Sequence, residues 1–263
     1  MTTWVLLRGW AREARHWEEF AQVLAAALPP GDRVVAPDLP GNGVRNSDAS
    51  PLSASAMVAA LRADLAQRRL RGPYAVVALS LGGMVAWQWA CERPRELAAC
   101  VLINTSVGGR SGFWQRLRPA AYLPLLGLLR PGVGGLERER AILALTSNHR
   151  AGDSALAARW AGYALERPVG AWNALRQLVA AARYRAPPAA PAVPILLLAA
   201  QADRLVAPEC SHGMARHWQL PVCTHATAGH DLPLDDPHWV AAQVLRWWET
   251  VGLRCHAPAT KVP

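Results

Sequence analysis

The sequence has few cysteines, a single lysine and no long apolar run. Five cysteines are spread over 263 residues, which excludes the disulfide framework of small secreted proteins and favours a reducing compartment. No stretch approaches the roughly 20 apolar residues that a membrane-spanning helix needs. The first residues, MTTWVLLRG, lack the basic start and the apolar length of a signal peptide. The sequence therefore predicts a cytoplasmic protein without a membrane span.

Positive charge is in excess but is not concentrated anywhere. The formal net charge is +9, and among the 28 basic residues only Lys261 is a lysine, the arginines being scattered along the chain. Nucleic-acid sites gather basic and aromatic residues together, so we expect no nucleic-acid partner, although the field can steer an anionic molecule toward the surface. Neither a phosphate-binding GxxxxGK[ST] motif nor a well-placed GxGxxG motif is present, and nucleotide cofactors are disfavoured.

One stretch, CSHGMARHWQLPVCTH, brings potential metal ligands together in the sequence. These are Cys210, His212, His217, Cys223 and His225. Their spacing matches no paired C-x2-C or H-x3-H arrangement, and the last two fall on an expected strand. We predict no metal site.

Short apolar runs alternate with segments of helical periodicity, in a chain that is 52% hydrophobic and 18% charged. The expected strands are residues 3–7, 33–36, 74–78, 97–103, 195–199 and 221–225, and the expected helices are 16–28, 53–69, 82–92 and 236–251, with Ser53 as an N-cap. Such alternation is typical of an α/β fold, with a parallel sheet of about six strands covered by helices on both faces.

The middle of the chain breaks this alternation. Residues 109–190 show helical segments with Gly and Pro breaks and end in the proline-rich RAPPAAPAVP. We therefore expect a first core part over 1–108, a helical cap insertion over 109–190, and a second core part over 191–263 that ends in a loose tail, CHAPATKVP.

The stretch VVALSLGGMVAW is the most informative one in the chain. An apolar strand runs into Ser80, which is followed at once by Leu81, two glycines and a helical pattern. A strand–Ser–helix turn with small neighbours is typical of a nucleophile elbow, in which the serine hydroxyl stands above the carboxyl edge of the sheet. The local motif alone is equally compatible with a serine that caps the helix.

Two later residues favour the catalytic interpretation. Asp203 follows the strand ILLLA, and His230 follows the next strand, in the loop ATAGHDLPLDDP. Serine, acid and histidine, each just past a parallel strand, occur in the chain order of an α/β-hydrolase triad. A serine hydroxyl is a poor nucleophile alone, so His230 would take its proton and Asp203 would orient the imidazole.

At these residues the chain resembles the α/β-hydrolase superfamily over nearly its whole length, and is similar to small capped carboxylesterases such as pimeloyl-acyl-carrier methyl ester esterases. The matching stretches are VLLRGW, DLPGNG, LSLGGMVA, LLLAAQADRLV and AGHDLPLDDP. The resemblance implies cleavage of a carboxylic ester or thioester, free or carrier-bound, through an acyl-enzyme and without a cofactor. It also implies an oxyanion hole formed by the N–H groups of Trp10 and Leu81.

Three features depart from the family pattern. Ala78 stands where the elbow normally opens with glycine, and Arg8 stands where the oxyanion loop usually has histidine. Arg8 could contact an anionic substrate or a loop carboxylate, or bond backbone carbonyls; the last is favoured. The usual N-terminal β-hairpin has no residues to form it, so the sheet edge at Arg33–Ala36 must be short or covered.

Aromatic and basic residues of the insertion are weaker candidates for substrate binding. Trp114 and Trp160 could line an acyl site, although core packing is the commoner role of such residues. Arg110, Arg116 and Arg118 could receive an acidic carrier, but a solvated basic face is favoured. The same scaffold supports acyl transfer, lyase chemistry or a non-catalytic binding module, and the oligomeric state is left open.

Overall fold

The structure is a computed structural model that describes residues 1–127 and 134–256, with no side chains described beyond residue 251. The tail predicted to be loose, CHAPATKVP, therefore lies almost wholly outside the described residues. Within the described part of the chain, no helix is long and apolar enough to cross a membrane.

A six-stranded sheet forms the centre of the protein, in the order β2-β1-β3-β4-β5-β6, and every neighbouring pair is parallel. The strands are β1 Thr3–Leu7, β2 Arg33–Val35, β3 Tyr74–Leu79, β4 Leu97–Ile103, β5 Ile195–Ala200 and β6 Val222–His225. This confirms the predicted parallel α/β sheet of six strands. The edge strand β2 is only three residues long, which limits pairing with another chain.

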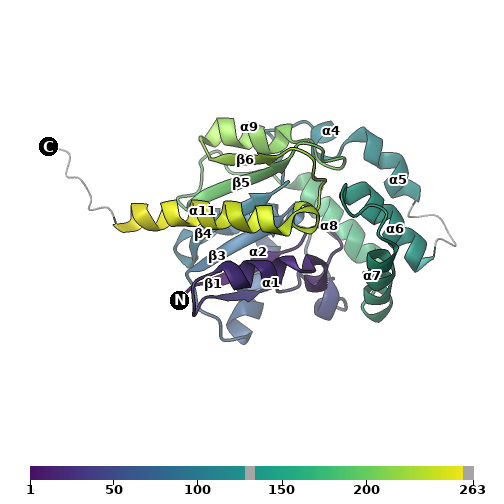
Figure 1. The fold of residues 1–263 in the computed structure, drawn as a ribbon, viewed down its shortest axis with the longest axis horizontal. Helices are drawn as coiled ribbons and strands as arrows, with labels where there is room; N and C mark the ends of the chain where they lie inside the picture. The colour runs from purple at the N-terminus through teal and green to yellow at the C-terminus, as the bar shows by residue number, and fades with distance from the viewer. Residues whose placement is uncertain (128–133, 257–263) are drawn as a thin grey trace.

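Helices cover both faces of the sheet (Figure 1). On one face lie α1 (Phe20–Ala27) and α11 (Pro237–His256), and on the other lie α2 (Ala54–Gln67), α3 (Leu81–Glu92) and α9 (Glu209–Trp218). Successive residues of a strand point to opposite faces, so β1 sends Trp4 toward α11 and Leu7 toward α3. Both faces are thus apolar, which explains why the strands are continuous hydrophobic runs.

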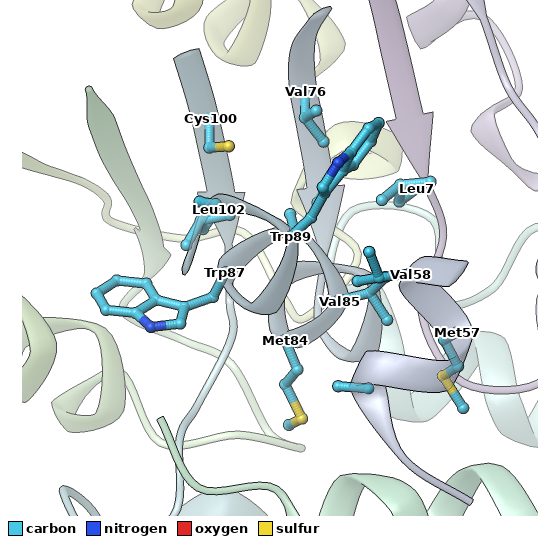
Figure 2. Close-up of a cluster of buried hydrophobic side chains, with 14 of the residues drawn as sticks. Leu7, Met57, Val58, Val76, Met84, Val85, Trp87, Trp89, Cys100 and Leu102 are labelled. Atoms are coloured by element: carbon cyan, nitrogen blue, oxygen red, sulfur yellow. The ribbon is translucent and has the colours of Figure 1, made fainter. Parts of the chain in front are cut away.

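The core beneath α2 and α3 is filled by large side chains of these helices and of the strands (Figure 2). The labelled members are Leu7, Met57, Val58, Val76, Met84, Val85, Trp87, Trp89, Cys100 and Leu102. Trp87 and Trp89 are fully buried. This packing fixes α3, and with it the turn from which α3 begins.

The helices differ from expectation mainly at their ends. The segment predicted as one helix from His16 is a 3-10 turn, η1 (Ala14–Trp17), followed by α1, because Glu18 has a φ of 48° and interrupts the helix. Ser53 caps α2 as predicted, its hydroxyl accepting from the N–H of Ala56 at 3.2 Å. The short elements are η2 Gly43–Arg45, η3 Pro94–Glu96, η4 Pro119–Ala121 and α10 Leu232–Asp235.

The segment between β4 and β5 is helical in its described residues. Its helices are α4 Phe113–Arg116, α5 Tyr122–Gly127, α6 Gly135–Thr146, α7 Ser154–Glu166 and α8 Ala171–Arg183. The helix α8 bonds the loop after β1, and the end of α6 bonds the loop after β6, through Asp231 N–H to Thr146 O at 2.7 Å. This segment between β4 and β5, called the insertion below, therefore lies over the carboxyl ends of the strands, at the right of Figure 1.

Candidate active site

Ser80 occupies a strained turn between β3 and α3. Its φ is 56° and its ψ is −116°, and its side chain makes no capping hydrogen bond to α3. The structure thus excludes the simple N-cap interpretation of this serine. Positive φ in a residue with a Cβ costs free energy and persists only where surrounding contacts impose it. Here Ser80 N–H donates to Ile103 O at 2.9 Å, and Thr105 Oγ1 donates to Ser80 O at 2.8 Å.

The two glycines after the turn are required by close approach. A Cβ on Gly82 would lie 2.4 Å from the carbonyl oxygen of Leu7, and one on Gly83 would lie 2.7 Å from Cβ of Thr105. The start of α3 therefore packs directly on the ends of β1 and β4. Ala78, the departure from glycine, is fully buried within β3.

The side chains of Asp203 and His230 contact one another. Nδ1 of His230 lies 2.7 Å from Oδ2 of Asp203, and both side chains are buried. The second oxygen of Asp203 accepts from the N–H groups of Leu205 at 2.7 Å and Val206 at 2.9 Å. The carboxylate is thus fixed by three hydrogen bonds, and its orientation fixes the imidazole ring.

The geometry defines which ring nitrogen of His230 is free. A carboxylate only accepts, so neutral His230 carries its proton on Nδ1 and presents an unprotonated Nε2. Within the described residues, Nε2 has no hydrogen-bond partner, and none joins it to the Ser80 hydroxyl. Catalytic hydrogen bonds often shorten only when substrate is bound.

Asn104 connects the loops that carry these three residues, and the sequence reasoning missed it. Its Nδ2 donates to the carbonyl of His230 at 2.8 Å, its Oδ1 accepts from Ala200 N–H at 2.8 Å, and its neighbour Ile103 accepts from Ser80 N–H. Asn104 is buried and has a φ of 45°, a conformation that asparagine tolerates. An asparagine directly after the strand LAACVLI was the signal available in the sequence.

The expected oxyanion donors lie beside the serine. Gly9 is so close to it that an added Cβ would lie 3.1 Å from Cβ and 3.7 Å from Oγ of Ser80. Within the described part of the chain, the N–H groups of Trp10 and Leu81 donate to no other protein group. Leu81 opens α3, where unpaired N–H groups carry partial positive charge. Both donors are therefore available to a ligand.

Arg8 binds a loop carboxylate, one of the alternatives weighed above. Its guanidinium donates to both oxygens of Asp231, at 3.0 and 2.5 Å, and each side chain is only 5% exposed. It also lies over the ring of Trp17, 4.9 Å from the centroid. This corrects both the expected substrate contact and the favoured backbone-carbonyl interpretation. The pair ties the loop after β1 to the residue that follows His230.

Two tryptophans proposed for substrate binding have other environments. Trp160 is fully buried, and its indole N–H donates to Glu18 at 2.7 Å. This corrects the expectation that Trp160 lines an acyl site, because its side chain is used to join α7 to the core. Trp114 is 55% exposed and contacts Phe113 edge to face, with ring centroids 5.3 Å apart. Its role in substrate binding stays a prediction.

Arg116 and Arg118 are partly buried and bond backbone carbonyls, which corrects the expected solvated face for these two residues, whereas Arg110 is exposed. Arg116 donates to the carbonyls of Ala181 and Ala182 at the end of α8, where positive charge complements the helix terminus. Arg118 donates to the carbonyl of Asp203 at 2.8 Å. Only Arg110, which lies over the ring of Trp218 at 5.4 Å, does not bond backbone in this way.

Contacts between buried polar side chains join the insertion to residues 12–18. Arg12 donates to Glu139 of α6 at 2.7 Å and lies 3.1 Å from Nε2 of His16. Burial lowers the pKa of His16 well below its ordinary value of 6.5, and the charges of Arg12 and Arg8 lower it further. His16 is therefore neutral, and because arginine only donates, Nε2 is the acceptor.

No group of three or more His, Cys, Asp or Glu side chains arranged to hold a metal ion occurs among the described residues. The stretch CSHGMARHWQLPVCTH contains the potential ligands considered in the sequence. Within it, Nε2 of His225 lies 3.3 Å from Oδ2 of Asp236. Each of the four cysteines whose side chains are described is a free thiol.

A sequence model of the Alpha/beta hydrolase family matches residues 4–243, which is most of the chain. The chain belongs to the alpha/beta hydrolase family.

This chain is similar over part of its length to a lipase and to a protein of biotin biosynthesis. It is 38% identical over 101 residues to the lipase LipV of Mycobacterium tuberculosis, which is 38% of this chain and 36% of that protein. It is 33% identical over 102 residues to the biotin biosynthesis bifunctional protein BioHC of Teredinibacter turnerae, which is 39% of this chain and 17% of that protein. The matched stretches are thus about a third and a sixth of those proteins' lengths.

This chain shares its fold with an esterase of known structure. The esterase RhEst1 from Rhodococcus sp. ECU1013 superposes with a TM-score of 0.72 at 23% identity, over 95% of this chain and 91% of the esterase. At this identity the likeness shows the fold alone.

Proposed function

We propose that this hydrolase is a serine esterase that cleaves a carboxylic ester through an acyl-enzyme intermediate. The observation that carries the proposal is the buried 2.7 Å contact between His230 and Asp203, in loops that Asn104 joins to the Ser80 turn. Ser80 has a positive φ and its side chain makes no capping hydrogen bond to α3, which supports the role of a nucleophile over that of a structural residue.

Each residue has a defined step in this mechanism. Ser80 Oγ attacks the acyl carbon while Nε2 of His230 takes its proton, and Asp203 stabilises the imidazolium that forms. The N–H groups of Trp10 and Leu81 bind the oxyanion, each worth about 3 kcal/mol in such sites. His230 then protonates the leaving alkoxide, and water activated by the same histidine releases the acid.

The substrate class is supported only by the relatives. LipV is named a lipase and BioHC a protein of biotin biosynthesis, so the acyl group is proposed to be that of an oxygen ester or a thioester, free or on a carrier. The domain division proposed from the sequence, with a cap over 109–190, would make insertion residues such as Trp114 part of the acyl site.

A p-nitrophenyl ester assay and fluorophosphonate labelling test the proposal together. We expect Ser80→Ala to lose turnover by at least about 10³-fold and to lose all labelling. Ser53→Ala, which removes only the cap of α2, should leave both unchanged. Labelling of Ser80 without ester turnover would indicate acyl transfer or lyase chemistry instead. A folded protein that neither labels nor turns over esters would be a binding module.

A further inference from the structure

The oxyanion loop, residues 9–11, is bonded from outside by a buried side chain of the insertion, Gln177 on α8. Its Oε1 accepts from the N–H of Ala11 at 2.9 Å, and its side chain is 1% exposed. Ala11 directly follows Trp10, whose N–H is the proposed oxyanion donor. A second bond from the same helix reaches this loop, since Nε1 of Trp10 donates to Ala174 O at 2.8 Å.

The loop needs such support because its backbone is not in a preferred conformation. Ala11 has a φ of 52°, which is unfavourable for a residue with a Cβ, and Gly9 on the other side of Trp10 is intrinsically free to rotate. Nothing within residues 9–11 therefore fixes the direction of the Trp10 N–H. The contacts with α8 supply that constraint.

The orientation of the Gln177 amide is fully determined by its partners. A backbone N–H can only donate, so the atom facing Ala11 is the oxygen. On the other side, Nε2 donates to Asn42 Oδ1 at 2.9 Å and to Ser50 Oγ at 3.0 Å. The Ser50 hydroxyl in turn donates to Pro40 O at 2.7 Å. Every polar atom of the amide is thus paired, and a buried, fully paired network is rigid.

We propose that Gln177 is a positioning residue, which aligns the oxyanion hole by holding the peptide next to its Trp10 donor. The proposal rests on the esterase function proposed above and assigns part of the catalytic geometry to the insertion. It also predicts that α8 influences the reaction without contacting the reacting atoms.

Two substitutions separate positioning from simple packing. Gln177→Leu keeps much of the volume and removes all three hydrogen bonds. Gln177→Glu keeps an acceptor for Ala11, replaces the donor that faces Asn42 and Ser50 by an oxygen, and introduces an ionisable group in a buried site. Removal of a complete oxyanion donor costs about 10²–10³-fold in kcat, so we expect a misaligned donor in Gln177→Leu to cost about 10–100-fold in kcat, with KM changed less than about threefold. Gln177→Glu should recover at least half of this loss on a logarithmic scale.

Asn173 offers a matched control on the same helix. Its amide binds the backbone of Asn46, Asp48 and Ser50 and has no bond to residues 9–11 among the described contacts. Asn173→Ala should therefore lower the thermal unfolding temperature as Gln177→Leu does, while kcat stays within about threefold of the wild-type value.

The experiment measures kcat, KM, the rate of fluorophosphonate labelling and thermal unfolding for wild type, S80A, N173A and both Gln177 variants. Equal kcat in wild type and folded Gln177→Leu overturns the proposal, as does an equal kcat loss in Asn173→Ala. If Gln177→Leu does not fold, a Gln177→Glu variant with the activity of the Ser80→Ala variant also overturns it. Absence of Ser80-dependent labelling and turnover in the wild type identifies the esterase proposal itself as the failure.

Discussion

The buried pair of Arg8 and Asp231 makes a strong prediction about stability. Each side chain is 5% exposed and the two are joined by two hydrogen bonds. Replacing Asp231 with Asn leaves the guanidinium buried without a counter-charge, and the loss of one partner of a buried pair costs about 3–5 kcal/mol in free energy of unfolding. For a chain of this size that corresponds to a fall in Tm of roughly 10 °C.

The double variant isolates the interaction itself. Replacing both partners by apolar residues, as in Arg8→Met with Asp231→Leu, removes the uncompensated charge as well as the pair. We expect the double variant to lose less free energy of unfolding than the single variants Arg8→Met and Asp231→Leu together, by at least about 2 kcal/mol, which is the signature of direct coupling.

Equilibrium urea unfolding measures these differences, with Glu166→Gln as the matched control. Glu166 pairs with Arg15 at 2.6 Å but is 61% exposed, and an exposed pair contributes only about 0–1 kcal/mol. Losses below about 1 kcal/mol in both single variants, or strict additivity in the double variant, would refute the assignment of Arg8 and Asp231 to a structural tie between the two loops.

Two further predictions concern close packing and pH. Gly82→Ala places a methyl group 2.4 Å from Leu7 O, so urea unfolding should show a loss of about 1–3 kcal/mol in free energy of unfolding, together with slower fluorophosphonate labelling. The control is Gly162→Ala in α7, where nothing lies within 4 Å and the free energy of unfolding should rise by about 0.4–1 kcal/mol. Equal effects of the two substitutions would contradict the packing argument. The pKa of His16 is lowered below 6.5 in the folded protein, so near pH 6 the unfolded chain is protonated at His16 and the folded protein is not. The contribution of His16 to the free energy of unfolding is therefore complete above about pH 7. It falls as the pH drops below 6.5, by at most about 1.4 kcal/mol per pH unit. His16→Gln should flatten this dependence between pH 7 and 5, and an unchanged slope in urea titrations would refute it.

The sheet and its order along the chain follow from local pattern. Strands such as ILLLA are short, apolar and bounded by turn residues, so they form wherever a sheet is available. The helix ends were less predictable, as at Glu18, whose positive φ breaks a segment with continuous helical periodicity. The Glu18 carboxylate at this break accepts from Arg159 and Trp160 of α7, and such long-range contacts are not encoded in the local sequence.

The candidate site divides in the same way. Ser80, Asp203 and His230 are candidates from the sequence because each lies in the segment that follows a parallel strand, and the carboxyl ends of parallel strands meet at one edge. Their supporting residues are not identifiable so simply. Asn104 and Gln177 act through hydrogen bonds to residues about 100 or more positions away, and a lone amide side chain has no distinctive pattern.

By itself, the sequence determined the fold class, the elbow and the order of the three polar residues, because periodicity and turn chemistry are local properties of the chain. Only the tertiary structure decided the partners of the buried charges. From the sequence, Arg8 could bind an anionic substrate, a loop carboxylate or backbone carbonyls. It bonds Asp231 because folding brings the loop after β1 beside the loop after β6. A buried charge must find a partner at close range, and which carboxylate is in range depends on how distant segments pack.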